Sequence, residues 1–273
     1  DKIDEAVFKA AGKQLKVVAN YAVGFDNIDL EAAKNRGVIV TNTPVPEMTE
    51  TVAEFTIALL LGVARKLREA DAFTRGHKYE GWSPNLFLGQ DLHGKTLGIV
   101  GAGRIGTRVA EIARLGFGMN ITYSSRKPDP ELSERLAAPF LPLDQLLHGA
   151  DVVSLHVPLT PETRHLISTE QFSLMKKTVI LLNTSRGPVI DEKALLRALR
   201  TGRIAGAGID VYEAEPAIDA DPTDQLELKN MPNVLLTPHI ASATVQTREA
   251  MGRLAAANIV AVLSGEAPLT AAG

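Results

Sequence analysis

The chain has 273 residues, of which 45% are hydrophobic and 22% charged, with a formal net charge of −3 and no cysteine. This length can bury a core large enough for two compact units. The small negative charge gives no electrostatic reason to expect nucleic acid or an anionic membrane as a partner. The lack of cysteine excludes disulfides, thiolate catalysis and thiolate metal ligands, and it fits a cytoplasmic protein.

Apolar runs in this sequence are too short to span a membrane, and the longest, residues 55–64, is bounded by Glu54 and Arg65. No signal-peptide pattern is visible. The sequence opens on Asp1 rather than on methionine. We therefore expect that N-terminal residues of the protein are missing from it.

The first 90 residues predict a helix over 3–11, a strand over 15–19, a helix over 28–34 and a strand over 38–41. Two prolines then favour an extended crossing before one long helix over about 47–75. A helix of that length is difficult to bury against a single small sheet. Part of it is therefore expected to pack on a second subunit, in a homodimer.

After residue 90, short apolar runs alternate with amphipathic stretches, a pattern typical of βαβ units and a parallel sheet. The six expected strands are residues 96–100, 120–123, 151–157, 178–183, 205–211 and 233–237. The expected helices are residues 104–115, 143–148, 168–175, 192–201 and, at the end, 244–263. Six buried strands with crossover helices predict an α/β fold with a doubly wound parallel sheet of the Rossmann type.

A glycine-rich turn follows the first of these strands. Residues 101–106 read Gly-Ala-Gly-Arg-Ile-Gly, the G-x-G-x-x-G pattern, between an apolar strand and an amphipathic helix. The first glycine permits a tight turn, the second lets a pyrophosphate approach the backbone, and the third lets helix and strand pack closely. The helix N-terminus attracts phosphates, so the turn predicts dinucleotide binding, with a purely structural turn as the alternative. The predicted phosphate-binding residues are Gly101, Gly103, Arg104, Ile105 and Gly106.

The segment after the second strand indicates which dinucleotide binds. An acidic residue here would bind the ribose diol of NAD, yet no carboxylate follows the strand before Asp129. The hydroxyls of Ser124 and Ser125 and the cations Arg126 and Lys127 suit a 2′-phosphate instead, because they donate hydrogen bonds and offset its charge. This favours NADP, with NAD still possible. The alternative is that the two cations are simply solvated, with the arginine stacking on the adenine of either cofactor.

Three polar segments follow later strands of the predicted sheet. They read Asn-Thr-Ser-Arg-Gly at 183–187, Asp-Val-Tyr-Glu-Ala-Glu-Pro at 210–216 and Thr-Pro-His-Ile-Ala-Ser at 237–242. Loops at the carboxyl ends of parallel strands converge on the ligand crevice of such a sheet. We therefore expect the three segments to face one pocket together with the glycine turn.

The residue types in these segments suit the reduction of a ketone beside a carboxylate. Hydride addition to the ketone carbon builds negative charge on its oxygen, which a protonated His239 relieves as general acid. Glu215 would raise the pKa of that histidine and orient its ring, and Arg186 would bind the substrate carboxylate and polarise the carbonyl. Each residue alone also has a structural explanation. Their joint occurrence beside a dinucleotide fingerprint favours catalysis.

Over essentially its whole length the sequence resembles the D-isomer-specific 2-hydroxyacid dehydrogenases, and within them most closely the glyoxylate/hydroxypyruvate reductases. The stretches that carry the resemblance are residues 20–29, 101–106, 156–160, 183–187, 208–211, 215–216 and 238–239. The resemblance implies an NAD(P)-dependent reductase that converts a small 2-keto acid, such as glyoxylate or hydroxypyruvate, to the D-2-hydroxy acid.

The resemblance also implies roles for single residues. His239 would be the proton donor, Glu215 its partner and Arg186 the substrate-binding residue, and the substrate carboxylate would also meet backbone N–H groups near Val23 and Gly24. Further cofactor contacts are implied at His156, Pro158, Thr184, Ser185, Arg186, Asp210, His239 and Ala241. For His156 and Pro158, an apolar wall is the alternative.

Two domains that close over a cleft are implied as well. A Rossmann cofactor domain would span residues 44–239. A smaller, flavodoxin-like substrate domain would span 1–43 and 240–273 and lack its N-terminal part, because the family's domain begins several tens of residues earlier. No metal is expected, because the six histidines form no ligand-spaced cluster with carboxylates.

Alternatives remain open both inside and outside this activity. Inside it, the substrate could be a larger sugar-derived keto acid such as 2-ketogluconate, or the chain could be a phosphoglycerate-type dehydrogenase with a basic pocket for a substrate phosphate. Outside it, a dinucleotide-sensing interaction protein like the transcriptional corepressors of this fold would retain the same three polar residues.

Overall fold

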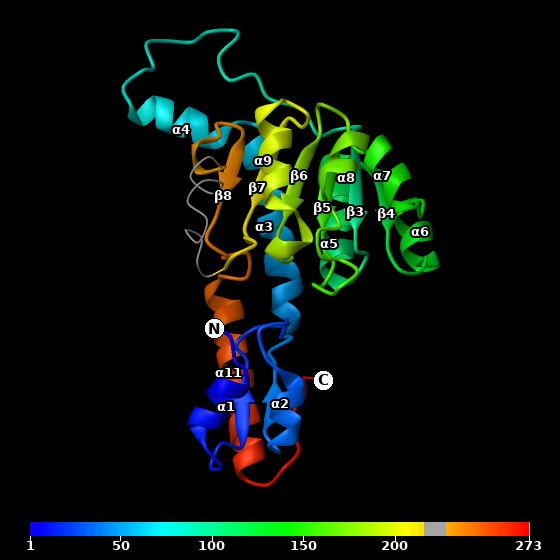
Figure 1. Cartoon of the computed structure of the whole chain (residues 1–273). Helices are drawn as coiled ribbons and strands as arrows, with labels where there is room; N and C mark the ends of the chain where they lie inside the picture. Colours follow the sequence, from blue (N-terminus) through cyan, green and yellow to red (C-terminus); the bar gives the residue numbers. More distant parts are fainter. Residues whose placement is uncertain (216–227, 273) are drawn as a thin grey trace. The chain divides into compact units, whose positions relative to one another are not determined.

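The computed structural model describes residues 1–215 and 228–272. The chain divides into two compact units, which we call unit 1 (residues 1–51 and 242–273) and unit 2 (residues 52–241). Figure 1 traces the chain through both of them. Among the described residues, no helix is both long and apolar enough to cross a membrane.

Unit 2 is built on a six-stranded parallel sheet in the order β4-β3-β5-β6-β7-β8 (Figure 1). The strands are β3 (Thr96–Val100), β4 (Asn120–Ser124), β5 (Val152–Leu155), β6 (Ile180–Asn183), β7 (Gly206–Ile209) and β8 (Val234–Leu236). The predicted α/β fold with a Rossmann-type sheet is therefore confirmed, and the strand ends differ from the predicted ones by a few residues.

The strand order reverses between β3 and β5. From β3 the chain runs outward to β4 and to a parallel bridge between Tyr123 and Phe140, and then returns to β5 on the other side of β3. In open parallel sheets the ligand crevice lies at the carboxyl ends of the strands at such a reversal. Gly101 directly follows β3 and His156 directly follows β5, so the glycine turn stands at this point.

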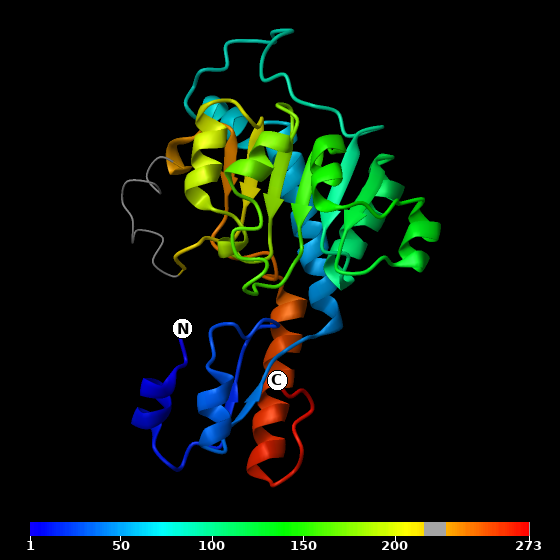
Figure 2. The same cartoon turned by 45° about the vertical axis from the view of Figure 1, so that its right-hand side comes forward.

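Helices cover both faces of the sheet, as Figure 2 shows. One core lies under α7 (Leu143–Gly149), α8 (Thr169–Leu174) and α9 (Glu192–Arg200). The other lies under α3 (Pro46–Ala64), α5 (Arg104–Phe117) and α6 (Pro130–Leu136). Neighbouring strand residues alternate between these cores: Leu181 packs in the first, and Ile180 and Leu182 pack in the second. Because both faces are buried, the strands appear in the sequence as continuous apolar runs.

The prediction of one helix over 47–75 is wrong. The structure has α3 and a separate α4 (Leu67–Arg75), and the chain turns between them at Lys66, whose φ is 53°. The N–H of Gln90 donates to the carbonyl of Ala64 over 2.9 Å. In a continuous helix, that carbonyl would instead accept an N–H from the next turn of the same helix. A returning segment of the chain therefore contributes to ending α3, and periodicity within the helix carries no sign of it.

Unit 1 contains a second, smaller parallel sheet. It pairs β1 (Val17–Ala19) with β2 (Ile39–Thr41) in the register that aligns Val18 with Val40. Its helices are α1 (Glu5–Ala11), α2 (Leu30–Asn35) and α11 (Val245–Leu263). Phe8, which is fully buried, packs in the small core of this unit.

Candidate active site

The glycine turn joins β3 to the N-terminus of α5. Gly101 has a φ of 99°, and its N–H donates to the carbonyl of Ser124 over 2.8 Å. A Cβ atom on Gly101 would lie 2.6 Å from the backbone oxygen of His156, and one on Gly106 would overlap the carbonyl of Gly101. The packing of the chain itself therefore requires both glycines.

Gly103 differs from its neighbours, because a Cβ atom there would meet no atom of the described chain within 4 Å. Its φ of −80° is open to any residue. Helix α5 begins at Arg104, and none of the described side chains caps its N-terminus. The first N–H groups of the helix, those of Arg104 and Ile105, are therefore left for a ligand at the turn. A pyrophosphate bound at that helix end accounts for a glycine that packing does not require. The turn thus fits the pyrophosphate of a dinucleotide.

The segment after β4 forms a tight turn, in which the hydroxyl of Ser125 donates to the carbonyl of Lys127 over 2.5 Å. Ser124 and Ser125 are partly buried, whereas Arg126 and Lys127 are exposed. Because the carbonyl of Ser124 accepts the N–H of Gly101, this segment lies directly beside the glycine turn.

His156 supports the turn from the other side. Its Nε2 lies 2.8 Å from the hydroxyl oxygen of the buried Ser154, and its N–H donates to the carbonyl of Val100. Burial lowers the pKa of His156 to about 4, so its ring is neutral at neutral pH. Pro158 is exposed. The contribution of both residues to cofactor binding stays a prediction.

The loop after β6 is shaped by the buried side chain of Asn183. Its Oδ1 accepts the N–H and the hydroxyl of Ser185 over 3.0 and 2.8 Å, and its Nδ2 donates to the carbonyl of Arg186 over 2.9 Å. The guanidinium of Arg186 donates in turn to the carbonyl of Ser185. The hydroxyl of Thr184 lies 3.0 Å from that of Thr56 on α3. Local hydrogen bonds from Asn183, the last residue of β6, therefore hold the tight loop that carries Arg186.

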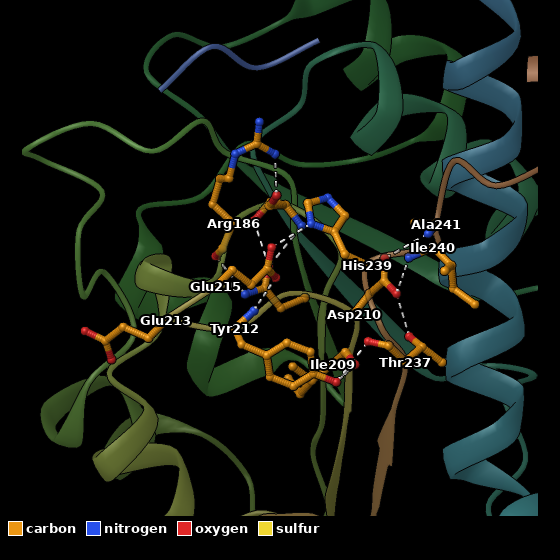
Figure 3. Close-up of polar contacts among 12 residues, drawn as sticks. Arg186, Ile209, Asp210, Tyr212, Glu213, Glu215, Thr237, His239, Ile240 and Ala241 are labelled. Carbon is orange, nitrogen blue, oxygen red and sulfur yellow. Dashed lines mark hydrogen bonds and ion pairs between the residues drawn. The ribbon is translucent and has the colours of Figure 1, made fainter. Parts of the chain in front are cut away.

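Asp210 is fully buried at the end of β7, and its carboxylate holds the loop after β8 (Figure 3). Oδ1 accepts the hydroxyl of Thr237 over 2.6 Å and the N–H of Ile240 over 2.9 Å, and Oδ2 accepts the N–H of Ala241 over 2.8 Å. His239, between these donors, has a φ of 53°, a left-handed conformation that few residues other than glycine adopt. The buried carboxylate thus holds His239 in a strained backbone conformation.

His239 and Glu215 form the hydrogen-bonded pair that the sequence predicts. The His239 Nδ1 lies 2.8 Å from the Glu215 Oε2, and the Glu215 Oε1 accepts the N–H of Tyr212 over 2.8 Å. The bond to Glu215 raises the pKa of His239 against the opposing effect of burial. Burial would raise the pKa of Glu215, but the bonds from His239 and Tyr212 outweigh it and the pKa is lowered. Because Nδ1 faces the carboxylate, Nε2 is the nitrogen that can meet a substrate.

Arg186 lies beside this pair in Figure 3. Its positive charge lowers the pKa of both His239 and Glu215, a secondary effect that depends on this proximity. The structure therefore brings the three predicted catalytic side chains together. Two contacts that position them, from the N–H of Tyr212 and the hydroxyl of Thr237, were not predicted, because nothing in periodicity or composition marks them.

Val23 and Gly24, the predicted substrate-binding backbone, belong to unit 1 and follow β1. Asn42 donates its side-chain amide to the carbonyl of Val23 over 2.8 Å, and Asn20 does the same for Gly24 over 2.7 Å. Their part in substrate binding stays a prediction. Pro216 of the predicted motif lies outside the described residues. Within residues 1–215 and 228–272, no three histidine or acidic side chains gather as they would around a metal ion.

Comparison with known proteins identifies the family. Residues 57–241 match the family model described as D-isomer specific 2-hydroxyacid dehydrogenase, NAD binding domain. The chain belongs to this family. It is therefore a D-2-hydroxyacid dehydrogenase that uses a nicotinamide cofactor, and the predicted resemblance is confirmed.

Relatives of this dehydrogenase include the glyoxylate reductase of Thermococcus kodakarensis, 52% identical over 274 residues, which cover 99% of this chain and 80% of the relative. The glyoxylate reductase of Korarchaeum cryptofilum is 51% identical over 98% of this chain and 79% of its own length. A similar solved structure is the TT0316 protein from Thermus thermophilus, with 48% identity, a TM-score of 0.90 and coverage of 100% of this chain and 83% of that one. Another is the D-lactate dehydrogenase from Aquifex aeolicus complexed with NAD and lactic acid, with 36% identity, a TM-score of 0.87 and coverage of 97% and 81%.

The glycines of the turn can be separated experimentally. We expect Gly103→Ala to raise the dissociation constant for the reduced cofactor about tenfold, roughly 1.4 kcal/mol, with little change in thermal stability, because the new methyl group meets only the ligand. Gly106→Ala should instead lower the free energy of unfolding by about 1–3 kcal/mol, because its methyl group overlaps the backbone. Fluorescence titration and thermal unfolding measure the two effects. Wild-type cofactor affinity in Gly103→Ala would contradict the assignment of the phosphate site.

Proposed function

We propose that this dehydrogenase reduces a small 2-keto acid, glyoxylate or hydroxypyruvate, to the 2-hydroxy acid, with NADPH preferred over NADH. The observation that carries the proposal is the 2.8 Å bond between His239 and Glu215, with Arg186 beside it. The names of the relatives support the choice of glyoxylate, since those at 52% and 51% identity are glyoxylate reductases.

A bound reduced nicotinamide supplies the hydride for the substrate carbonyl carbon. Arg186 binds the carboxylate of the 2-keto acid through charge-assisted hydrogen bonds and polarises the neighbouring carbonyl. His239 donates a proton from Nε2 to the carbonyl oxygen as negative charge develops there, so the product is the neutral alcohol. Glu215 keeps the ring protonated before the transfer and holds Nδ1, which fixes the direction of Nε2. Asp210 maintains the backbone conformation of His239 throughout.

The preference for NADPH rests on the segment after β4. Arg126 and Lys127 are exposed there, directly beside the glycine turn, where the adenosine ribose follows the pyrophosphate. A 2′-phosphate at that position gains charge-assisted bonds from the arginine and the hydroxyl of Ser124. Within 124–128 no carboxylate is present to accept from the ribose diol of NADH or to repel a phosphate.

Loss of the proton donor should slow the chemical step. We expect His239→Ala to lower kcat for glyoxylate reduction by about 10²–10⁴-fold with little change in the dissociation constant for NADPH, because the ring acts on the substrate oxygen. Steady-state kinetics and cofactor titration separate these effects. A panel with hydroxypyruvate, 2-ketogluconate and a phosphorylated keto acid tests the substrate class. Undiminished turnover by His239→Ala, or a preference for the larger acids, would contradict the proposal.

The rate should depend on pH through His239. The reductive step needs the protonated ring, so kcat stays at its plateau below the histidine pKa and falls as pH rises through it. Because Glu215 raises that pKa, Glu215→Gln should move the fall in kcat to lower pH. A pH profile of kcat for both proteins measures the shift. A fall at the same pH in the variant would show that Glu215 does not control the protonation of the ring.

The cofactor preference has its own test. We expect Arg126→Ala to raise KM for NADPH at least about tenfold more than KM for NADH, because only NADPH carries the 2′-phosphate. Lys177→Ala is the control, since this exposed lysine precedes β6 and lies at the amino ends of the strands, away from the glycine turn. Equal changes in both Michaelis constants would mean that the arginine only stacks on the adenine or remains solvated.

A homodimer is the assembly that we infer for this enzyme. Helix α4 buries none of its residues, and the segment that follows it extends away from the sheet in Figures 1 and 2. Apolar side chains are exposed along this part, which we call the arm: Leu67, Tyr79, Trp82, Leu86 and Leu88. Exposed aromatic groups of this kind are typical of the centre of protein interfaces. A second copy of the chain, presenting the same surface about a twofold axis, would cover them.

The exposed arm predicts that the enzyme is a dimer in solution. Light scattering after size exclusion should give about twice the chain mass of 29.2 kDa. The double variant Trp82→Glu, Leu88→Glu should shift the equilibrium toward the single chain, because both side chains, 83% and 62% exposed, would place charge in the interface. A wild-type protein that stays at the single-chain mass at micromolar concentration would contradict the inference.

A further inference from the structure

A second histidine–glutamate pair lies close to the catalytic one in the chain. Glu213, two positions before Glu215, points away from the catalytic side chains in Figure 3. Its Oε1 lies 2.6 Å from the Nε2 of His165 and 3.5 Å from the guanidinium of Arg164. His165 has a left-handed backbone, with a φ of 53°, so this loop is strained where it presents the ring. Nothing in the proposed chemistry uses these groups.

The same glutamate is bound to the start of α9. The N–H of Glu213 donates to Oε1 of Glu192 over 2.5 Å, and the N–H of Glu192 donates to Oε2 of Glu213 over 3.4 Å. Each carboxylate thus accepts from the backbone of the other residue. The exchange ties the loop after β7 to the first residue of the helix that follows the loop after β6.

Those two loops also touch directly. A Cβ atom on Gly187, the residue after Arg186, would overlap the backbone of Tyr212. The N–H of His165 donates to the carbonyl of Pro188 over 2.8 Å, so the histidine loop is bound to the segment after Arg186 as well. Glu213 is therefore joined, by side chain and backbone, to the start of α9 and, through His165, to the segment after Arg186.

We propose that Glu213, His165 and Glu192, which we call the outer clasp, position Arg186 and Glu215 for the reaction. The three are positioning residues, and none touches the reacting atoms. Arg186 and Glu215 stand on loops, whose placement regular backbone bonding does not determine. A misplacement of about 1 Å in such a constellation lowers rates by about 10²-fold. The inference rests on the proposed roles of Arg186, Glu215 and His239.

The test removes the clasp and reads its effect on the catalytic pair. In Glu213→Ala we expect kcat for glyoxylate to fall about ten- to a hundredfold, with KM for NADPH within about twofold of wild type. The fall of kcat with pH should move to lower pH, because Glu215 is no longer held at Nδ1 of His239. Glu213→Gln, which keeps a hydrogen-bonding side chain of the same length, should recover most of the rate. Glu170→Ala, at an exposed glutamate of α8, is the matched control and should behave as wild type.

An NMR titration of the His239 ring in each variant, without substrate, separates this inference from the proposed function. A lowered pKa of His239 in Glu213→Ala supports the clasp whichever 2-keto acid the enzyme reduces, whereas failure of glyoxylate turnover in the wild type concerns the proposed function alone. If Glu213→Ala does not fold, His165→Ala removes the partly exposed partner and should produce the same shift. A folded variant with wild-type kcat, pH profile and His239 titration overturns the proposal.

Discussion

The carboxylate of Asp210, fully buried at the end of β7, is the group on which the geometry of the proposed active site depends. A buried charge is costly unless it is hydrogen-bonded, and here the loop after β8 provides the donors: Thr237, Ile240 and Ala241. Those donors lie on both sides of His239. The hydrogen bonds that this carboxylate requires thus determine where His239, the proposed proton donor, lies, and they keep its backbone in the left-handed conformation.

Exposure to solvent increases from Asp210 to Glu215. Asp210 contacts backbone and hydroxyl groups only, whereas Glu215, which is more exposed, contacts the ring of His239. Opposite effects therefore act on the pair: burial favours the neutral forms, and the hydrogen bond favours the charged ones. The bond outweighs burial, which suits a general acid that must carry its proton before the substrate oxygen becomes negative.

The glycine turn shows how one motif serves two purposes. Gly101 and Gly106 are required by contacts inside the chain, with the backbone of His156 and with each other. Gly103 meets nothing of the described chain at its missing Cβ, which fits the close approach of a pyrophosphate. Because all six strands are parallel, this turn and the loops after β6, β7 and β8 lie at the same end of the sheet. Packing contacts within the chain thus specify the fold of unit 2, whereas the proposed phosphate site lies where these contacts leave space.

The sequence by itself determined the six strands, the glycine turn and the chemical types of the proposed catalytic residues. Strands buried on both faces leave continuous apolar runs, and chemistry needs particular side chains at the carboxyl ends of those strands. Family resemblance, which the comparison confirmed, came from the same local motifs. All of these signals lie within short stretches of chain.

Tertiary structure alone decided the rest, because each remaining feature depends on residues far apart in the sequence. The break between α3 and α4 coincides with a hydrogen bond from Gln90 to Ala64. Helix α6 was not predicted, because its seven residues are too few to show a clear helical periodicity of apolar side chains. Asp210 was predicted only as a cofactor contact, yet its carboxylate accepts hydrogen bonds from residues that are 27 to 31 positions away in the sequence. Glu213 carried no predicted role, and only the fold brings its Oε1 within 2.6 Å of the Nε2 of His165, 48 positions away.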